Sequence, residues 1–266
     1  MKIARLFATW QGAGLVCAVL VFVFLILPTA LVIFMSFGDK RDLVFPPTGF
    51  SLDLYRRYFS ESGWTQATVL SFRIALMSAT VALALGTMAA IGLARSDFRG
   101  KRLLSLLLHS PIMIPGVAIA LALYLYFNNL GIRDNTTRLV LGHVVLTLPF
   151  VLVTVSAGLR HVDESLERAA TIMGAGQFVV FRRVTLPLLA PSLTVGWLFA
   201  FVTSFDEVIV SWFLVRAGFM TLPVKMYSSI MFEISPVLAA ISSMLTALTV
   251  FVCIIMAVLQ EKEPST

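Results

Sequence analysis

Two neighbouring carboxylates, Asp206 and Glu207, lie in an otherwise apolar part of the sequence. A carboxylate within a bilayer costs at least about 2.5–3.5 kcal/mol, so it should face a cavity or a partner. If the segment is one continuous helix, polar residues four positions before and after Glu207 lie on the same helix face, and one more borders that face. They are Thr203, Ser204 and Ser211. This pattern predicts a polar stripe that attracts a cationic solute; the alternative is an interhelical bond to Arg73 or to a partner subunit.

Aromatic residues near this stripe could also attract a cation. Trp197 and Phe201 lie four residues apart, and aromatic faces bind ammonium groups. Trp197 is therefore included in the candidate solute pathway, although contact with the core or lipid is the more common role of such rings. His143, in an earlier apolar run, is interpreted mainly as a hydrogen-bonding partner of a neighbouring helix.

The composition places the chain in a membrane. Of its 266 residues, 59% are hydrophobic and 13% are charged, compared with roughly 45–50% and about 25% in soluble domains. Several runs exceed the about 20 residues that cross a bilayer as a helix. The predicted spans are 6–38, 74–94, 103–132, 139–159, 184–205 and 234–260. We therefore expect an all-α, polytopic membrane protein with six transmembrane helices in one domain, residues 1–266.

Loop charges predict the orientation of these helices. With a cytosolic N-terminus, eleven basic residues lie in the cytosol and eight outside, which agrees with the positive-inside rule. The cluster RSDFRGKR, Arg95–Arg102, contributes most to this bias. Both termini are expected in the cytosol, and the first run is interpreted as a retained helix because it is longer than a signal-peptide core. The net charge of +6 indicates contact with anionic lipid, without a nucleic-acid-binding signature.

The third run contains helix-breaking residues at Pro111 and at Pro115–Gly116. Proline removes a backbone donor and clashes with the preceding turn, so we expect a kink or an unwound turn there. Such a break could line a pathway or serve only packing. The two cysteines lie in apolar runs and the three histidines are scattered, so no metal site is expected.

A charged, amphipathic segment at about 160–187 separates the fourth and fifth predicted spans. Acidic residues (Asp163, Glu164, Glu167) lie near its start and Arg182 and Arg183 near its end, which complements a helix dipole. Small residues lie between them, and they permit close approach by another chain. They are Ala169, Ala170, Gly174, Ala175 and Gly176. The segment is interpreted as a docking site for a cytosolic partner, with a simple interfacial helix as the alternative.

The spacing in AATIMGAGQFVVFRRVTLP resembles the cytoplasmic EAA loop of permease subunits of binding-protein-dependent ABC importers. Residues that match the loop pattern are Ala169, Ala170, Gly174, Val184, Leu186 and Pro187. One residue departs from it: Arg168 occupies the usual glutamate position, and Glu167 precedes it. The region from His143 to Met244 is most similar to the second permease of spermidine/putrescine-type importers.

The resemblance implies a type I ABC importer permease fold with a cytosolic coupling helix seated on an ATP-binding subunit. It implies coupling residues Glu164, Glu167, Arg168, Ala169, Ala170, Gly174 and Ala175. It also implies a heterodimer with a related permease, two cytosolic ATP-binding subunits, an external solute-binding protein and a bacterial inner-membrane location. ATP and Mg would be bound by the ATPase, and no GxxxxGK[ST] loop is present here. The chain is therefore expected neither to be an enzyme nor to bind a cofactor.

Polyamine is the preferred solute, and amino acids or other small organic solutes are the alternative. A secondary transporter would show coupling-ion residues on paired broken helices, and a channel would need a polar ring in an oligomer. Both remain open as less favoured classes, because neither explains the cytosolic segment.

Overall fold

The computed structural model describes residues 2–39, 45–215, 218–232 and 235–261. Within these residues the regular elements are helices, apart from one isolated bridge between Gly38 and Phe50. The all-α prediction is thus confirmed for the described chain. The chain divides into two units, 1–65 with 228–266 and 66–227. Ile234, where the last predicted span begins, lies outside the described residues.

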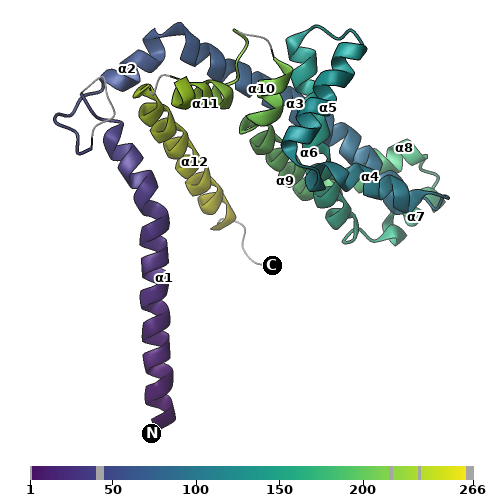
Figure 1. Cartoon of the computed structure of the whole chain (residues 1–266). Coiled ribbons are helices and arrows are strands. Elements are labelled where there is room, and N and C mark those ends of the chain that lie inside the picture. The colour runs from purple at the N-terminus through teal and green to yellow at the C-terminus, as the bar shows by residue number, and fades with distance from the viewer. Residues whose placement is uncertain (1, 40–44, 216–217, 233–234, 262–266) are drawn as a thin grey trace. The chain divides into compact units, whose positions relative to one another are not determined.

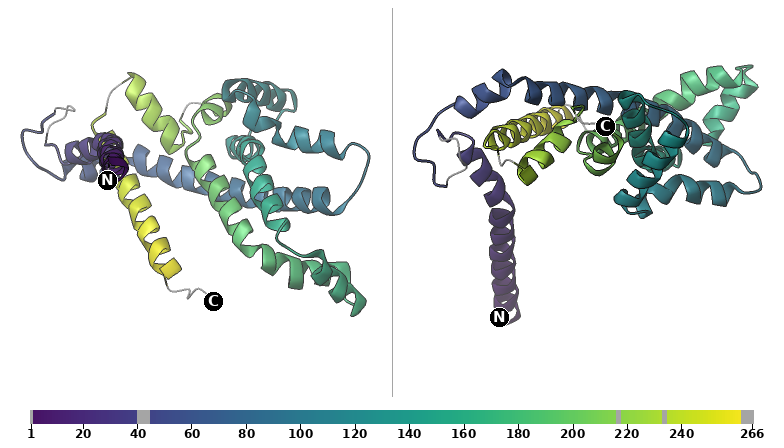
Figure 2. Two further views of the ribbon diagram at one scale, coloured as in Figure 1. Left: turned by 90° about the horizontal axis from the view of Figure 1, so that it is seen from below. Right: turned by 45° about the horizontal axis from the view of Figure 1, so that its top comes forward.

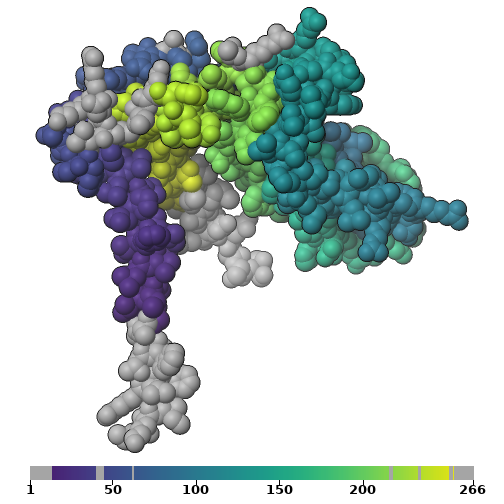
Figure 3. Space-filling view, viewed as in Figure 1, coloured from purple at the N-terminus to yellow at the C-terminus, as the bar shows by residue number. Residues whose placement is uncertain are grey.

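The first unit contains α1 (Lys2–Met35), α2 (Asp53–Ser60) and α12 (Val237–Glu261). Tyr55 of α2 joins the other two helices: its hydroxyl shares a 2.7 Å hydrogen bond with Ser36 Oγ and donates to Ser243 Oγ at 3.1 Å. The apolar side chains along the middle of α1 are exposed, and Figure 3 shows them uncovered on the side in view. Such a uniformly apolar, uncovered helix fits a lipid environment.

The second unit holds most of α3 (Ser62–Arg95) and the helices that follow it (Figures 1 and 2). These are α4 (Lys101–Met113), α5 (Gly116–Asn129), α6 (Asn135–Leu159), α7 (Glu164–Ile172), α8 (Gln177–Val180), a π-helix (Phe181–Thr185), α9 (Leu186–Phe205), α10 (Ile209–Leu214) and the start of α11 (Leu222–Phe232).

Helices α6 and α9 pack side by side at the centre of this unit (Figures 1 and 2). Their contact relies on small residues. A Cβ on Gly196 would lie 2.5 Å from Thr154 Oγ1, and one on Gly158 would lie 2.2 Å from Ser192 Oγ. Small residues at such crossings let two backbones approach closely, which is how helices associate in lipid.

Four described helices are long and apolar enough to cross a membrane: 14–35, 63–95, 135–159 and 177–205. The predicted third span is instead a pair, α4 and α5, bent by 110°. The described apolar part of α12, Val237–Phe251, is shorter than a span. The described chain therefore provides four clear spans, a bent pair of span length and one shorter apolar helix.

The break between α4 and α5 confirms the prediction made from the prolines. Ile114 is extended (φ −88°, ψ 134°) directly before Pro115, as expected for a residue whose helical conformation clashes with the proline ring. Pro111, by contrast, lies inside α4. There the Ser110 hydroxyl donates to the Leu107 carbonyl at 2.8 Å, which supplies that oxygen with the bond that Pro111 cannot donate.

A buried histidine joins three helices of the second unit. His143 of α6 shares hydrogen bonds with Ser204 of α9 through Nδ1 (2.7 Å) and with Ser211 of α10 through Nε2 (2.8 Å). All three side chains are buried. A neutral imidazole offers one donor and one acceptor, so one serine donates and the other accepts. The predicted role of His143 as an interhelical partner is confirmed.

We expect His143→Ala to destabilise the protein by about 1–3 kcal/mol, because it leaves two serine hydroxyls buried without their partner. Thermal unfolding of the detergent-solubilised chain measures this effect as a lower midpoint. His161→Ala is the matched control, since His161 is exposed just after α6. Equal midpoints for the two variants would contradict the role of His143.

Candidate functional site

The segment at 160–187 begins with a helix that caps its own N-terminus. The Asp163 carboxylate accepts a 2.8 Å hydrogen bond from the Ser165 backbone N–H. Glu164 and Glu167 follow in the first turn, where carboxylates complement the helix dipole. A hydrogen bond from Arg168 and the charge of Arg95 lower the pKa of the Glu164 carboxyl below its usual value. Glu164 therefore stays ionised further into the acidic range than a free glutamate.

Helix α7 ends in a glycine cap. Gly174 has φ +90°, and its N–H donates to the Thr171 carbonyl at 2.9 Å, while the Ala175 N–H reaches the Ala170 carbonyl at 3.1 Å. These two bonds are those of a Schellman motif, which needs a left-handed residue at this position. The glycine that matches the EAA pattern thus stops α7 and turns the chain into α8.

Glu167 connects α7 to two other elements. Arg95 Nη2 at the end of α3 donates to Glu167 Oε1 at 3.3 Å, and Arg95 Nε lies 3.2 Å from Oε2 as an ion pair without hydrogen-bond geometry. Thr185 of the π-helix donates to Oε1 at 2.8 Å. Arg95 also bonds to Glu164 at 2.6 Å. We call this group of Arg95, Glu164, Glu167 and Thr185 the coupling clamp.

Burial supports the strength of the coupling clamp. The Thr185 side chain is buried, and about a fifth of the Arg95 and Glu167 side chains is exposed. Ion pairs at exposed surfaces contribute only about 0–1 kcal/mol, whereas a partly buried pair with additional hydrogen bonds is more costly to break. The clamp therefore holds α7 to the end of α3 and to the helix that leads into α9.

The same segment also exposes large apolar side chains to solvent. Ile172 is 86% exposed, Met173 82% and Phe178 73%. Arg168 points outward as well, with 75% of its side chain exposed and a 2.9 Å bond to Glu164. A solvent-exposed group of large apolar side chains beside polar residues is typical of a protein–protein contact.

The predicted coupling residues thus separate into two sets. Glu167 and the buried Ala170 face the protein, while Arg168 and Ala169 are exposed and Ala175 is half-buried. Glu167, displaced by one position from the usual glutamate, is used within the chain by the coupling clamp. The side chain available to a partner at the usual position is therefore a cation, Arg168.

The structure corrects the predicted polar stripe. Helix α9 ends at Phe205, and α10 begins only at Ile209. Glu207 lies in the break, where its carboxylate accepts from the Val210 N–H and so caps α10. Asp206 follows the last turn of α9 and is exposed. Thr203, Glu207 and Ser211 therefore do not stack on one continuous helix, because the chain leaves the helical path between them.

The remaining pathway candidates have contacts within the second unit. Ser204 is buried against His143, and Thr203 is half-buried. Trp197 stacks on Phe201 at 5.4 Å and donates from Nε1 to Thr80 of α3 at 3.3 Å. Of the five candidates, Asp206 and Glu207 lie together at the break, while Trp197 packs between helices more than two turns before it.

Two members of the coupling clamp, Arg95 and Thr185, were not predicted as functional residues. Arg95 entered the sequence analysis only as part of a basic cluster, and Thr185 is the variable spacer of the motif. The one signal in the sequence was Glu167, which stands one position before the usual glutamate of the motif. A partly buried carboxylate at that position would need a basic residue as its ion-pair partner. Sequence alone offers many basic residues as that cation.

Comparison with known proteins agrees with this arrangement. Residues 82–262 match the family described as "Binding-protein-dependent transport system inner membrane component". The spermidine/putrescine transport system permease protein PotC of Escherichia coli K12 is 32% identical over 234 residues, 88% of each chain. The putrescine transport system permease protein PotI of the same organism is 32% identical over 238 residues, 87% of this chain and 84% of its own.

A solved structure has the same fold. In a bacterial ABC transporter involved in the import of the acidic polysaccharide alginate, one chain superposes with a TM-score of 0.72 at 17% identity, covering 95% of this chain and 97% of its own. The family match includes the coupling clamp and most of the helices, so the similarity extends well beyond one motif. The chain belongs to the binding-protein-dependent transport system inner membrane components, and it is a permease subunit of an ABC transporter rather than an enzyme.

Proposed function

We propose that this chain is one of two related permeases in an ATP-driven importer of polyamines, coupled to its ATPase through residues 160–187. The single observation that supports coupling most strongly is the coupling clamp together with the exposed apolar side chains at the end of α7 and in α8. The clamp fixes α7 to α3 and to the π-helix, while Ile172, Met173 and Phe178 stay exposed to a partner.

The clamp suggests how movement would pass from the ATPase to the membrane. A displacement of α7 reaches α3 through Arg95, and it reaches α9 through the unbroken helical path from Gln177 to Phe205. Rigid elements joined in this way move as a body. Two spans would therefore respond together when two ATP-binding subunits, which hold ATP and Mg, close.

The membrane arrangement is part of the proposal. Six spans follow if α4 with α5 and α12 each cross or enter the bilayer in addition to the four clear spans. The coupling segment then lies in the cytosol of a bacterium with both termini, and residues 1–266 act as one permease domain. An external solute-binding protein would deliver the solute to the other side.

The choice of a polyamine is supported by the names of the relatives and by two carboxylates. PotC and PotI are named for spermidine and putrescine transport. At the break between α9 and α10, Asp206 is exposed and Glu207 lies beside it. Two negative charges at an interrupted helix would favour a solute with ammonium groups. Thr203, Ser204 and Trp197 would then shape the pathway nearby.

We expect Gly174→Ala to lower transport more than Gly176→Ala, although a Cβ meets nothing within 4 Å at either position. Gly174 has φ +90° while Gly176 has φ −68°, so only the first variant is strained, by about 1–2 kcal/mol. Gly174→Asp, which adds a charge at the docking side, should abolish uptake while membrane insertion stays normal. Uptake into proteoliposomes of the complete importer measures both effects, and equal uptake by the two alanine variants would contradict the role of the cap.

The function is tested by uptake of labelled spermidine and putrescine, with and without ATP, by the importer reconstituted with its binding protein. Glu207→Gln keeps an amide oxygen that can accept from Val210, so it removes charge while preserving the cap. Asp206→Asn removes an exposed charge. We expect ATP-dependent uptake by the wild type and a reduction of about tenfold or more in the double variant, for a loss of about 1.4 kcal/mol or more.

Other results would refute parts of the proposal. ATP-independent uptake would contradict the importer mechanism. Uptake unchanged in both acidic variants would contradict the carboxylate site while leaving the importer in place. ATP hydrolysis stimulated by the binding protein without movement of either polyamine would contradict the solute.

A further inference from the structure

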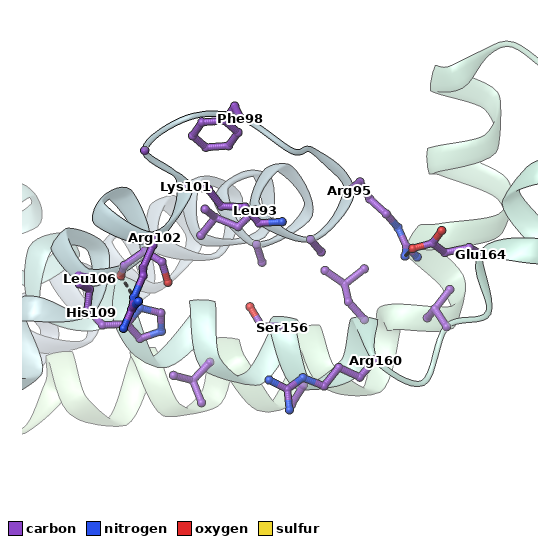
Figure 4. Close-up of a pocket in the computed structure, with 18 residues that line it drawn as sticks. Leu93, Arg95, Phe98, Lys101, Arg102, Leu106, His109, Ser156, Arg160 and Glu164 are labelled. Atoms are coloured by element: carbon purple, nitrogen blue, oxygen red, sulfur yellow. Dashed lines mark hydrogen bonds and ion pairs between the residues drawn. The ribbon is translucent and has the colours of Figure 1, made fainter.

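A separate cleft of about 1280 Å³ lies between the ends of α3 and α6 and the start of α4 (Figure 4). Its lining contains five residues of the basic cluster RSDFRGKR, Arg95–Arg102. Arg102 and Arg160 lie on different sides of the cleft, with Lys101 on the α4 side (Figure 4). Cations from three elements therefore surround one space.

The charge of the lining is unbalanced. It includes four cationic side chains, Arg95, Lys101, Arg102 and Arg160, and a single carboxylate, Glu164. Arg95 is bound in the coupling clamp, and Lys101 pairs with the fully exposed Asp97 at 3.2 Å. Arg102 and Arg160 have no ion-pair partner among the described residues. These two guanidinium groups are available to an anion.

The backbone adds to the attraction for an anion. Helix α4, 13 residues long, begins after Gly100, which has φ +94° and provides no side-chain cap. Gly100 itself lines the cleft. Uncapped N–H groups at a helix start attract phosphate, and here they add to the four cationic side chains.

The cleft becomes apolar away from its basic end. Along α3 the lining passes from Arg95 back to Ala90, and along α6 from Arg160 back to Val153. At about 1.5 Å per residue these apolar walls lie roughly 8–10 Å from the basic groups. Both helices are long and apolar enough to cross a membrane. The cleft thus has a basic end at the level where the spans end and an apolar end within the span.

We propose that this cleft binds an anionic phospholipid, with the phosphate between Arg102 and Arg160 and an acyl chain along the apolar walls. Arginine forks match phosphate oxygens, and basic sites between transmembrane helices are suited to lipid headgroups. A free phosphate ion could pair with the cationic side chains, but it would leave the apolar walls of the cleft without a contact. The leaflet concerned rests on the proposed membrane orientation; the site itself does not rest on transport.

Occupancy would place a lipid directly beside the coupling clamp. Arg95 and Glu164 line the cleft and also belong to the clamp. The headgroup is therefore in a position to stabilise the same end of α3 that holds α7.

The test uses the full-length chain in nanodiscs of phosphatidylcholine with added phosphatidylglycerol, followed by native mass spectrometry. The variant is Arg102→Gln with Arg160→Gln. The control is Arg99→Gln with Arg182→Gln, which loses the same charge at exposed residues outside the cleft. We expect the affinity for phosphatidylglycerol to fall ~30-fold in the cleft variant, at about 1 kcal/mol per cation, and to stay close to wild type in the control.

Three results would overturn the proposal. The first is an equal loss in both double variants, which would indicate a general charge effect. The second is displacement of phosphatidylglycerol by inorganic phosphate, which would indicate a free-anion site. The third is efficient cross-linking of an Arg102→Cys chain to another subunit, which would mean that protein fills the cleft. Lipid retention is measured without transport, so a failed uptake assay leaves this test unaffected.

Discussion

The ion pair between Arg95 and Glu167, completed by the Thr185 hydroxyl, is the interaction on which the functional arrangement depends. It fixes how α7 is oriented on the protein, and in that orientation Arg168, Ile172 and Met173 remain largely exposed. Because Glu167 is used within the chain, the side chain presented at the usual acidic position is a cation. A partner surface that meets α7 should accordingly provide apolar walls and an acceptor for Arg168.

The core of the second unit provides the rigidity that this arrangement needs. The missing side chains of Gly158 and Gly196 make room for Ser192 and Thr154 of the opposite helix, so α6 and α9 pack closely. His143 then ties both sides of the α9–α10 break to α6 through two serines. The break is thereby held in place while Asp206 stays exposed. The solute site proposed above would use this interruption, whose two ends are fixed to α6.

Local rules predicted the all-α character and the break before Pro115, since each follows from nearby residues. Gly174 was predicted only as a small residue and a motif match, and its role as a helix cap came from the structure. The polar stripe was wrong because it assumed one continuous helix, and nothing in the apolar pattern indicates where α9 ends. Arg95 was missed because its acidic partners lie about 70 residues away in sequence, and several basic residues could have filled that role equally well.

The central claim is that Arg95 and Glu167 couple α7 to α3. A double-mutant cycle tests it, and the measured quantity is the number of solute molecules transported per ATP hydrolysed. The variants are Arg95→Gln, Glu167→Gln and both together, with Asp97→Asn and Lys101→Gln as a matched exposed pair. The account predicts that the Arg95/Glu167 double variant is impaired no more than either single variant, which corresponds to an interaction energy of about 0.5–3 kcal/mol. For the exposed Asp97/Lys101 pair it predicts an interaction energy close to zero. Additive losses at Arg95 and Glu167, or unimpaired coupling in all three variants, would contradict it.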